Sequence, residues 1–199
     1  YLLKAVSCED GDIFYFDYAN LMYNENNLDL IDKNGCLTGQ KEIRKVVHEK
    51  GLAHHASGLI IFSKKFGEYN ILSQQRSLKK EKNAGLWDIS ASGHISHGEK
   101  PIDSLIREVK EELGIDIKSN DLILLGKFWR NETHKIDFIE NELDYIYMVE
   151  KNIDINSIQI QKEEVENSKI KEIIPYQSVT PVPNAHPSIE GLFMPRDVT

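Results

Sequence analysis

The chain has 199 residues, 40% of them hydrophobic, and a formal net charge of −8. This length and apolar content suffice for one buried core, and no shift in composition marks a second domain. The acidic balance argues against binding of nucleic-acid polymers, although it leaves nucleotides held through a metal open. With two cysteines and no apolar run near the roughly 18 residues of a membrane span, we expect reduced thiols, no membrane contact and a cytoplasmic location.

The predicted elements are mostly strands. Apolar or alternating runs bounded by Gly, Asn, Asp or charged turns predict them. These runs are residues 29–32, 55–62, 69–77, 122–130, 143–150 and 170–175. One clear helix begins at Pro101, residues 161–167 predict a short helical turn, and residues 40–49 have an ambiguous periodicity. The mixture predicts the α/β class, in its α+β form.

Three segments are predicted along the chain. Residues 1–27 are an N-terminal extension that packs on or beside the domain, and residues 28–180 form the domain itself. Residues 181–195 contain four of the six prolines, which is typical of an extended segment without regular structure. We therefore assign residues 181–199 to a C-terminal tail.

The helix that begins at Pro101 has clear signals at both ends. Proline is tolerated in a first helical turn, where its missing amide has no partner, and Gly114 suits the left-handed residue that follows a helix. Between them, apolar residues recur at spacings of three and four. They are Ile102, Leu105, Ile106, Val109 and Leu113. This stripe predicts a helix packed against a sheet.

The opposite face of this helix is acidic. Glu108, Glu111 and Glu112 are related by spacings of three and four, so their carboxylates project from neighbouring turns toward a common point. Three like charges repel one another unless a cation lies among them, and Mg²⁺ prefers carboxylate oxygens and accepts substrate phosphates as further ligands. The alternative is a solvated acidic face supported by Lys110 and Arg107.

Residues 93–115 read GHISHGEKPIDSLIREVKEELGI. The first glycine, the glutamate six places on and the REVxEELGI ending stand in one frame, which resembles the Nudix box at every defining position. The resemblance implies that the three glutamates and the Gly93 carbonyl bind a metal, and that Arg107 pairs with Glu99. It also implies the Nudix fold, a mixed β-sheet sandwiched between helices. The final helix usual in that fold is not found in this sequence.

The resemblance extends beyond the box to the Nudix branch related to type 1 isopentenyl-diphosphate isomerases. The segments that carry it are NLDLIDKNGCLTG, GLAHHASGLIIF, ILSQQRS, GLWDISASGHIS and NELDYIYMV. Those isomerases have a catalytic cysteine two residues before a histidine, where this chain has Ser92 before His94. A serine hydroxyl is far harder to ionise than a thiol, so Ser92 favours hydrolysis over isomerisation.

Several histidines and acids outside the box match isomerase positions. His48, His54 and His94 align with histidines that bind metal in the isomerases, although single histidines more often serve packing or hydrogen bonding. Glu140 and Glu142 align with a paired Glu-Asn-Glu, at the place where many Nudix hydrolases carry a base or metal ligand. Glu142 is the stronger candidate, and the alternative for both is an exposed acidic hairpin.

A basic cluster follows the strand predicted at residues 69–77. Arg76 is followed by Lys79, Lys80 and Lys82. Because arginine offers a planar fork to phosphate and lysine a mobile charge, Arg76 and Lys80 are predicted to bind the substrate's diphosphate. An ordinary basic loop is the alternative.

Together these features predict a Mg²⁺- or Mn²⁺-dependent Nudix hydrolase. Its partner would be a small organic or nucleoside diphosphate, which is attacked by metal-activated water. Two alternatives stay open: an isomerase acting on isopentenyl diphosphate, and a Nudix domain that binds a phosphorylated ligand without turnover. A homodimer is also left open.

Overall fold

The computed structural model describes residues 3–7, 13–17, 27–65, 68–80 and 82–172. The chain divides into two compact units. Unit 1 comprises residues 1–55, 94–99 and 129–143, and unit 2 comprises residues 56–93, 100–128 and 144–199. Among the described residues, four strands contribute to both units. They are β5 (His54–Lys65), β8 (Ala91–His94), β9 (Ile123–Lys135) and β10 (Phe138–Glu150).

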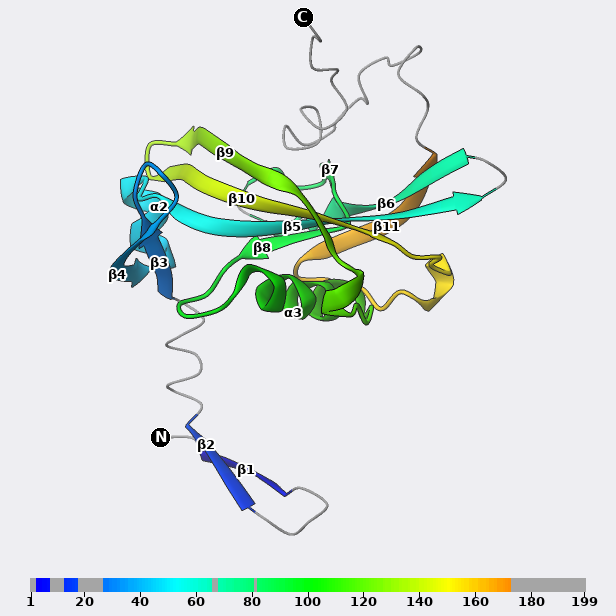
Figure 1. The fold of residues 1–199 in the computed structure, drawn as a ribbon, viewed down its shortest axis with the longest axis horizontal. Coiled ribbons are helices and arrows are strands. Elements are labelled where there is room, and N and C mark those ends of the chain that lie inside the picture. The colour runs from blue at the N-terminus through cyan, green and yellow to red at the C-terminus, as the bar shows by residue number, and fades with distance from the viewer. Residues whose placement is uncertain (1–2, 8–12, 18–26, 66–67, 81, 173–199) are drawn as a thin grey trace, which may run out of the picture. The chain divides into compact units, whose positions relative to one another are not determined.

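Unit 2 is built on a sheet that one helix covers. Its strands pair in the order β11 (Val165–Glu172), β6 (Glu68–Arg76), β5, β10 and β9. The short strands β7 (Trp87–Asp88) and β8 (Ala91–His94) pair with β6 and β5, respectively. Helix α3 (Pro101–Leu113) lies along one face of the sheet (Figure 1). Two single turns of 3-10 helix, η1 (Ser119–Asp121) and η2 (Ile155–Ser157), complete the described part of the unit.

The core of unit 2 follows from the alternation of its strands. The apolar stripe of α3 is buried through Leu105, Val109 and Leu113 against Leu59 and Ile61 of β5. The intervening Ile60 joins a second cluster on the other side of the sheet. Each fully buried leucine or valine contributes about 1.5–3 kcal/mol, so this packing fixes the orientation of α3.

The ends of α3 confirm the predicted signals. Pro101 stands in the first turn. Gly114 adopts a left-handed conformation with φ of +70°, and its N–H donates to the Lys110 carbonyl. The acidic face of the helix therefore projects from a segment whose start, end and buried side are all fixed.

Unit 1 combines hairpins with a short helix. Strands β1 (Leu3–Ser7) and β2 (Ile13–Asp17) pair antiparallel, as do β3 (Asn27–Ile31) and β4 (Leu37–Ile43). Helix α2 (Arg44–Lys50) follows β4 directly and ends at Gly51, which has φ of +61°. Strand β3 also pairs with the start of β5 through Leu30 and His54.

The mixed sheet with few helices confirms the predicted fold class, and each predicted strand overlaps an observed one. Residues 173–175 of the last predicted strand lie outside the described residues. The helical turn predicted at residues 161–167 is wrong. A turn at residues 162–164 leads into β11, because Val165 pairs with Arg76 and is fully buried. The ambiguous residues 40–49 divide between the end of β4 and α2. Strands β1, β2, β4, β7 and β8 were not predicted.

The predicted tail, residues 181–199, lies outside the described residues. In the part of the chain that the structure describes, no helix is both long and apolar enough to cross a membrane.

Candidate functional site

Glu112 is the most deeply placed of the three glutamates on α3. It is 5% exposed, and Gln74 of β6 donates a hydrogen bond to its Oε2 atom at 3.2 Å. Burial, reinforced by the neighbouring charge of Glu108, raises the pKa of Glu112 to about 8. An ionised Glu112 is therefore costly in this environment unless a cation compensates its charge.

Glu108 depends on the absence of a side chain at Gly93. A Cβ atom at Gly93 would lie 2.7 Å from the Glu108 Cγ atom and closer still to its carboxyl group. Any larger residue would therefore displace the Glu108 carboxylate. Glycine is therefore needed at this position of the box for steric reasons and not for its backbone conformation, because the φ of Gly93 does not lie in the left-handed region.

Arg107 holds the outer glutamates of α3. Its Nη1 atom donates to Glu108 Oε1 at 2.9 Å and to Glu111 Oε2 at 3.1 Å, and its Nη2 atom donates to Ser104 at 3.3 Å. The three glutamates do not form a group of ligand atoms within 4.8 Å of one another, among the described residues. Their metal-binding role and the pair of Arg107 with Glu99 stay predictions.

The two basic residues predicted to bind phosphate are held by acids of unit 2. Arg76 ends β6, and its Nη1 atom lies 3.6 Å from Asp88 Oδ2. The Arg76 Nε atom is buried without a hydrogen-bond partner among the described residues. Lys80 pairs with Glu164. Substrate would have to share or displace these ion pairs.

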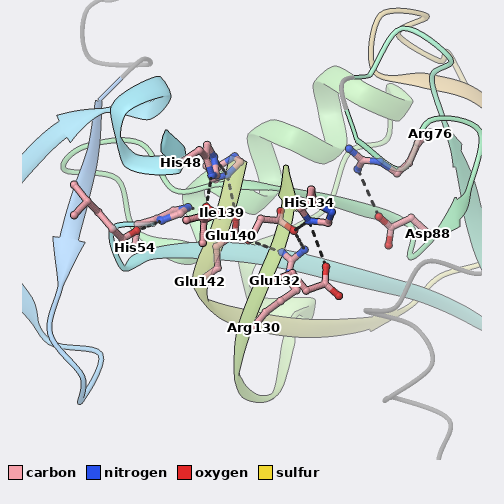
Figure 2. A network of polar contacts seen from close by, with 12 residues as sticks. His48, His54, Arg76, Asp88, Arg130, Glu132, His134, Ile139, Glu140 and Glu142 are labelled. Atoms are coloured by element: carbon pink, nitrogen blue, oxygen red, sulfur yellow. Dashed lines mark hydrogen bonds and ion pairs between the residues drawn. The ribbon is translucent and has the colours of Figure 1, made fainter. Parts of the chain in front are cut away.

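Unit 1 brings together four side chains that the sequence separates widely. His48 lies on α2, His54 begins β5, His94 ends β8 and Glu142 lies on β10 (Figure 2 labels three of them). One ligand atom from each falls within 4.8 Å of every other. His54 and Glu142 are at most 1% exposed. We call this group the histidine centre.

Backbone carbonyls orient two rings of the histidine centre. The Nδ1 atoms of His48 and His54 lie 3.3 Å and 2.9 Å from the carbonyl oxygens of Ile139 and Leu52, respectively. A ring that donates its Nδ1–H to a carbonyl has its lone pair on Nε2, which is how proteins prepare histidine as a metal ligand. Both rings therefore turn a ligand atom toward the centre.

The distances within the histidine centre fit a small four-coordinate cation. His48 Nε2 lies 3.1 Å from His94 Nε2, and Glu142 Oε1 lies 3.4 Å from His54 Nε2 and 3.3 Å from His94 Nε2. Tetrahedral bonds of about 2.0–2.1 Å separate neighbouring ligand atoms by about 3.3–3.4 Å. Three nitrogens and one oxygen suit zinc and similar transition metals better than Mg²⁺.

The protonation states in this centre agree with ligand chemistry. Burial, with the charge of Arg44, holds the pKa of His94 well below its ordinary value, so its imidazole is neutral. Burial alone would raise the pKa of Glu142, but His54, His94 and Arg130 together hold it well below its ordinary value. Neutral imidazole and ionised carboxylate are the forms that bind metal.

A second polar group lies on the hairpin of β9 and β10. Arg130 Nη1 donates to Glu140 Oε2 at 3.2 Å, and its Nη2 atom donates to Glu142 Oε2 (Figure 2). His134 Nε2 lies 2.6 Å from Glu140 Oε2 and 3.4 Å from Glu132 Oε2. The alternative interpretation of Glu140 and Glu142 as part of an exposed acidic hairpin is excluded, because both residues are almost fully buried.

Arg130, Glu132 and His134 were not predicted as site residues. Alternate residues of a strand share one face, and this spacing relates all three on β9 and relates Glu140 to Glu142 on β10. The sequence therefore held a signal. It was missed because the predicted strand ended at residue 130, whereas β9 continues to Lys135.

The comparisons with known proteins agree with this fold and box. The model of the NUDIX domain matches residues 53–195, more than half of the chain. A solved structure from Deinococcus radiodurans is similar in fold, with a TM-score of 0.56 over 73% of this chain and 82% of that chain at 14% identity. A MutT NUDIX hydrolase from Burkholderia pseudomallei gives a TM-score of 0.51 over 70% and 95% at 20% identity.

Curated relatives are closer in sequence. A Nudix hydrolase of Clostridium acetobutylicum is 36% identical over 71% of this chain and 67% of its own length. Nudix hydrolase 3 of Arabidopsis thaliana is 34% identical over 77% of this chain, which spans only 20% of that protein. An isopentenyl-diphosphate Delta-isomerase of Serratia proteamaculans is 33% identical over 60% of this chain and 63% of its own length.

The mixed sheet and the intact box, whose three glutamates lie on α3, together define the class of protein. The chain belongs to the Nudix hydrolase family.

Proposed function

We propose that the chain is a metal-dependent hydrolase that cleaves the diphosphate linkage of a small organic or nucleoside diphosphate. The observation that carries the proposal is the placement of Glu112, which is buried on α3 beside Glu108 with its pKa raised to about 8. Such a carboxylate has little structural value, because burial penalises its charge. A divalent cation bound at this face of α3 would compensate the negative charge of the ionised Glu112 carboxylate.

Glu108, Glu111 and Glu112 would hold Mg²⁺ or Mn²⁺, with the Gly93 carbonyl as a further ligand. When bound, the metal polarises phosphoryl oxygens and lowers the pKa of a water. Arg107 neutralises Glu108 and Glu111 through hydrogen bonds of 2.9 Å and 3.1 Å. It therefore orients the carboxylates of Glu108 and Glu111 on α3.

Arg76 and Lys80 are proposed to bind the substrate phosphates. Arg76 has a buried Nε–H without a partner among the described residues, and its contact with Asp88 is long at 3.6 Å. A phosphate oxygen would satisfy that donor and offer the planar guanidinium a paired acceptor. Lys80 would leave Glu164 to reach a second phosphate.

We also infer that the histidine centre holds a divalent transition metal. Three distances between its ligand atoms, 3.1 Å, 3.3 Å and 3.4 Å, are close to those of tetrahedral coordination, and the His48 and His54 rings are oriented by backbone carbonyls. Glu142 is thus proposed as a ligand of this centre.

The second candidate function is diphosphate isomerisation. Two observations favour it: the intact histidine centre and the relatives that carry the isomerase name. Ser92, half-buried on β8 at the place of the isomerase cysteine, weighs against it because its hydroxyl is poorly acidic. Incubation with isopentenyl diphosphate in deuterated water should leave the dimethylallyl product absent or unlabelled.

A phosphate-release screen tests the proposed function. The panel comprises nucleoside diphosphates and triphosphates, sugar nucleotides, prenyl diphosphates and thiamine diphosphate, each with Mg²⁺ and with Mn²⁺. We expect metal-dependent release from at least one substrate, its loss in Glu111→Gln, and its retention in Asp103→Asn, which removes an exposed acid of the same helix. Equal turnover in Glu111→Gln and wild type would refute the assigned role of the box.

A further inference from the structure

Arg130 connects two buried carboxylates that stand two residues apart on β10. Its two terminal nitrogens donate to Oε2 of Glu140 and to Oε2 of Glu142. Glu140 is 0% exposed and Glu142 is 1% exposed. Two buried like charges at this spacing repel strongly, and a planar guanidinium is the side chain that can serve both at once.

The two oxygens of Glu142 consequently face different partners. Oε2 is held by Arg130, whereas Oε1 lies 3.4 Å from His54 Nε2 and 3.3 Å from His94 Nε2. The carboxylate cannot turn both oxygens into the histidine centre without breaking its contact with Arg130. Glu142 is thus restricted to a single ligand oxygen.

Glu140 is not a member of the histidine centre, which consists of His48, His54, His94 and Glu142. The Glu140 Oε2 atom accepts from Arg130 and lies 2.6 Å from His134 Nε2. Glu140 instead belongs to a separate polar network with Glu132 and His134 (Figure 2). Four ligand atoms remain for the centre: three imidazole nitrogens and one carboxylate oxygen.

We propose that Arg130 determines the metal selectivity of the histidine centre by limiting it to four protein ligand atoms. The inference rests on the proposed metal binding at this centre. Four ligands with three nitrogens favour zinc and cobalt(II), whereas cations of higher coordination number, such as Mn²⁺, need more oxygens. Without Arg130, Glu142 can bind through both oxygens and the centre becomes permissive to Mn²⁺.

The test uses Co²⁺ as a spectroscopic probe on the full chain. Four-coordinate Co²⁺ absorbs visible light strongly and six-coordinate Co²⁺ weakly, so the spectrum reports coordination without any assay of turnover. The decisive comparison is between the single variant Glu140→Gln and the double variant that combines Arg130→Gln with Glu140→Gln. Both lack the Glu140 charge and differ only at Arg130, and the double variant removes one charge of each sign. Arg130→Lys, which keeps a positive charge without the fork, is a second variant for the case of poor folding.

We expect strong four-coordinate spectra from wild type and from Glu140→Gln. The double variant should give a weak spectrum and a ratio of Mn²⁺ to Zn²⁺ affinity raised at least about tenfold, which corresponds to roughly 1.4 kcal/mol. Arg130→Lys should change in the same direction by a smaller amount. Lys135→Gln removes an exposed cation of the same strand and should match wild type.

Three results would overturn the proposal. A six-coordinate spectrum in wild type contradicts the four-ligand limit, although the metal centre itself would stand. Unchanged spectra and affinity ratios in the folded Arg130 variants contradict the role of Arg130. Absence of Co²⁺ binding by wild type removes the metal centre as well, while the hydrolase at the box would still be judged by phosphate release.

Discussion

The acidic face of α3 and the histidine centre offer ligands in opposite ways. The first takes its glutamates from consecutive turns of one helix, and Glu111 has half of its side chain exposed. The second takes three buried side chains and the partly buried His94 from four elements, and the four ligand atoms lie within 4.8 Å of one another. The α3 face is thus suited to a metal exchanged with solvent and shared with substrate, and the histidine centre to a metal retained by the protein.

The largest expected effect separates the two regions by function. Glu112→Gln removes the buried carboxyl group of α3 and should lower kcat for diphosphate cleavage by about 1000-fold, because charge stabilisation by the proposed metal is the main catalytic term. Co²⁺ binding at the histidine centre should be unchanged. The measurements are phosphate release and the cobalt spectrum of the same preparation. Loss of both would show that the regions are not independent.

The second prediction concerns stability against pH. The pKa of Glu112 is about 8 in the folded chain and 4.5 in the unfolded chain, so the folded state binds a proton more tightly. Its stabilising contribution is full below pH 4.5 and is lost as pH rises through 8, with a loss of about 3–4 kcal/mol between pH 5 and pH 8.

Urea unfolding in EDTA at pH 5, 6.5 and 8 checks this slope. The free energy of unfolding of wild type should fall relative to Glu112→Gln as pH rises, since the glutamine variant lacks only this titration. Excess Mg²⁺ should restore stability at pH 8. Parallel curves for the two proteins would show that Glu112 ionises normally in the folded state.

The third prediction addresses the metal proposed at the histidine centre. His54 is fully buried and its ring is fixed by the Leu52 carbonyl. His54→Gln should weaken Zn²⁺ binding by about 100-fold through loss of one preorganised ligand. Competition with a chromophoric chelator measures the affinity, and His97→Gln, which alters a histidine outside the centre, is the control. Equal losses in both variants would contradict the assignment of His54.

The smallest effect is expected at the proposed phosphate site. Arg76→Gln keeps a polar side chain beside Asp88 but loses the charged fork. KM for an accepted diphosphate should rise about tenfold with a smaller change in kcat, as for a residue that binds ground state and transition state alike. Steady-state kinetics separate the two constants. An unchanged KM would assign Arg76 to structural pairing with Asp88.

Prediction from sequence succeeded where the information is local. Pro101, Gly114 and the apolar stripe through Leu105 and Val109 define α3, because helix ends and periodicity depend on neighbouring residues. It failed at residues 161–167, where pairing with β6 decides in favour of a strand over local preference. The environment of Glu112 was also not predictable, since its burial depends on contact with Gln74 of β6.

The histidine centre marks the limit of such prediction. His48 and His94 are 46 residues apart, yet their Nε2 atoms lie 3.1 Å apart. Only the fold creates that distance. A resemblance could name the histidines as candidates, but the role of Arg130 depends on which oxygens of Glu140 and Glu142 it contacts. Such side-chain geometry has no local sequence signal.

Cleavage in ¹⁸O-labelled water tests the central claim most directly. With Mg²⁺ or Mn²⁺ and any substrate found in the screen, wild type should place one ¹⁸O atom in a phosphate product for each linkage cleaved. Glu112→Gln should release almost no labelled product over the same time. Product formation without ¹⁸O, or labelled product at the wild-type rate from Glu112→Gln, would contradict hydrolysis by water at the acidic face of α3.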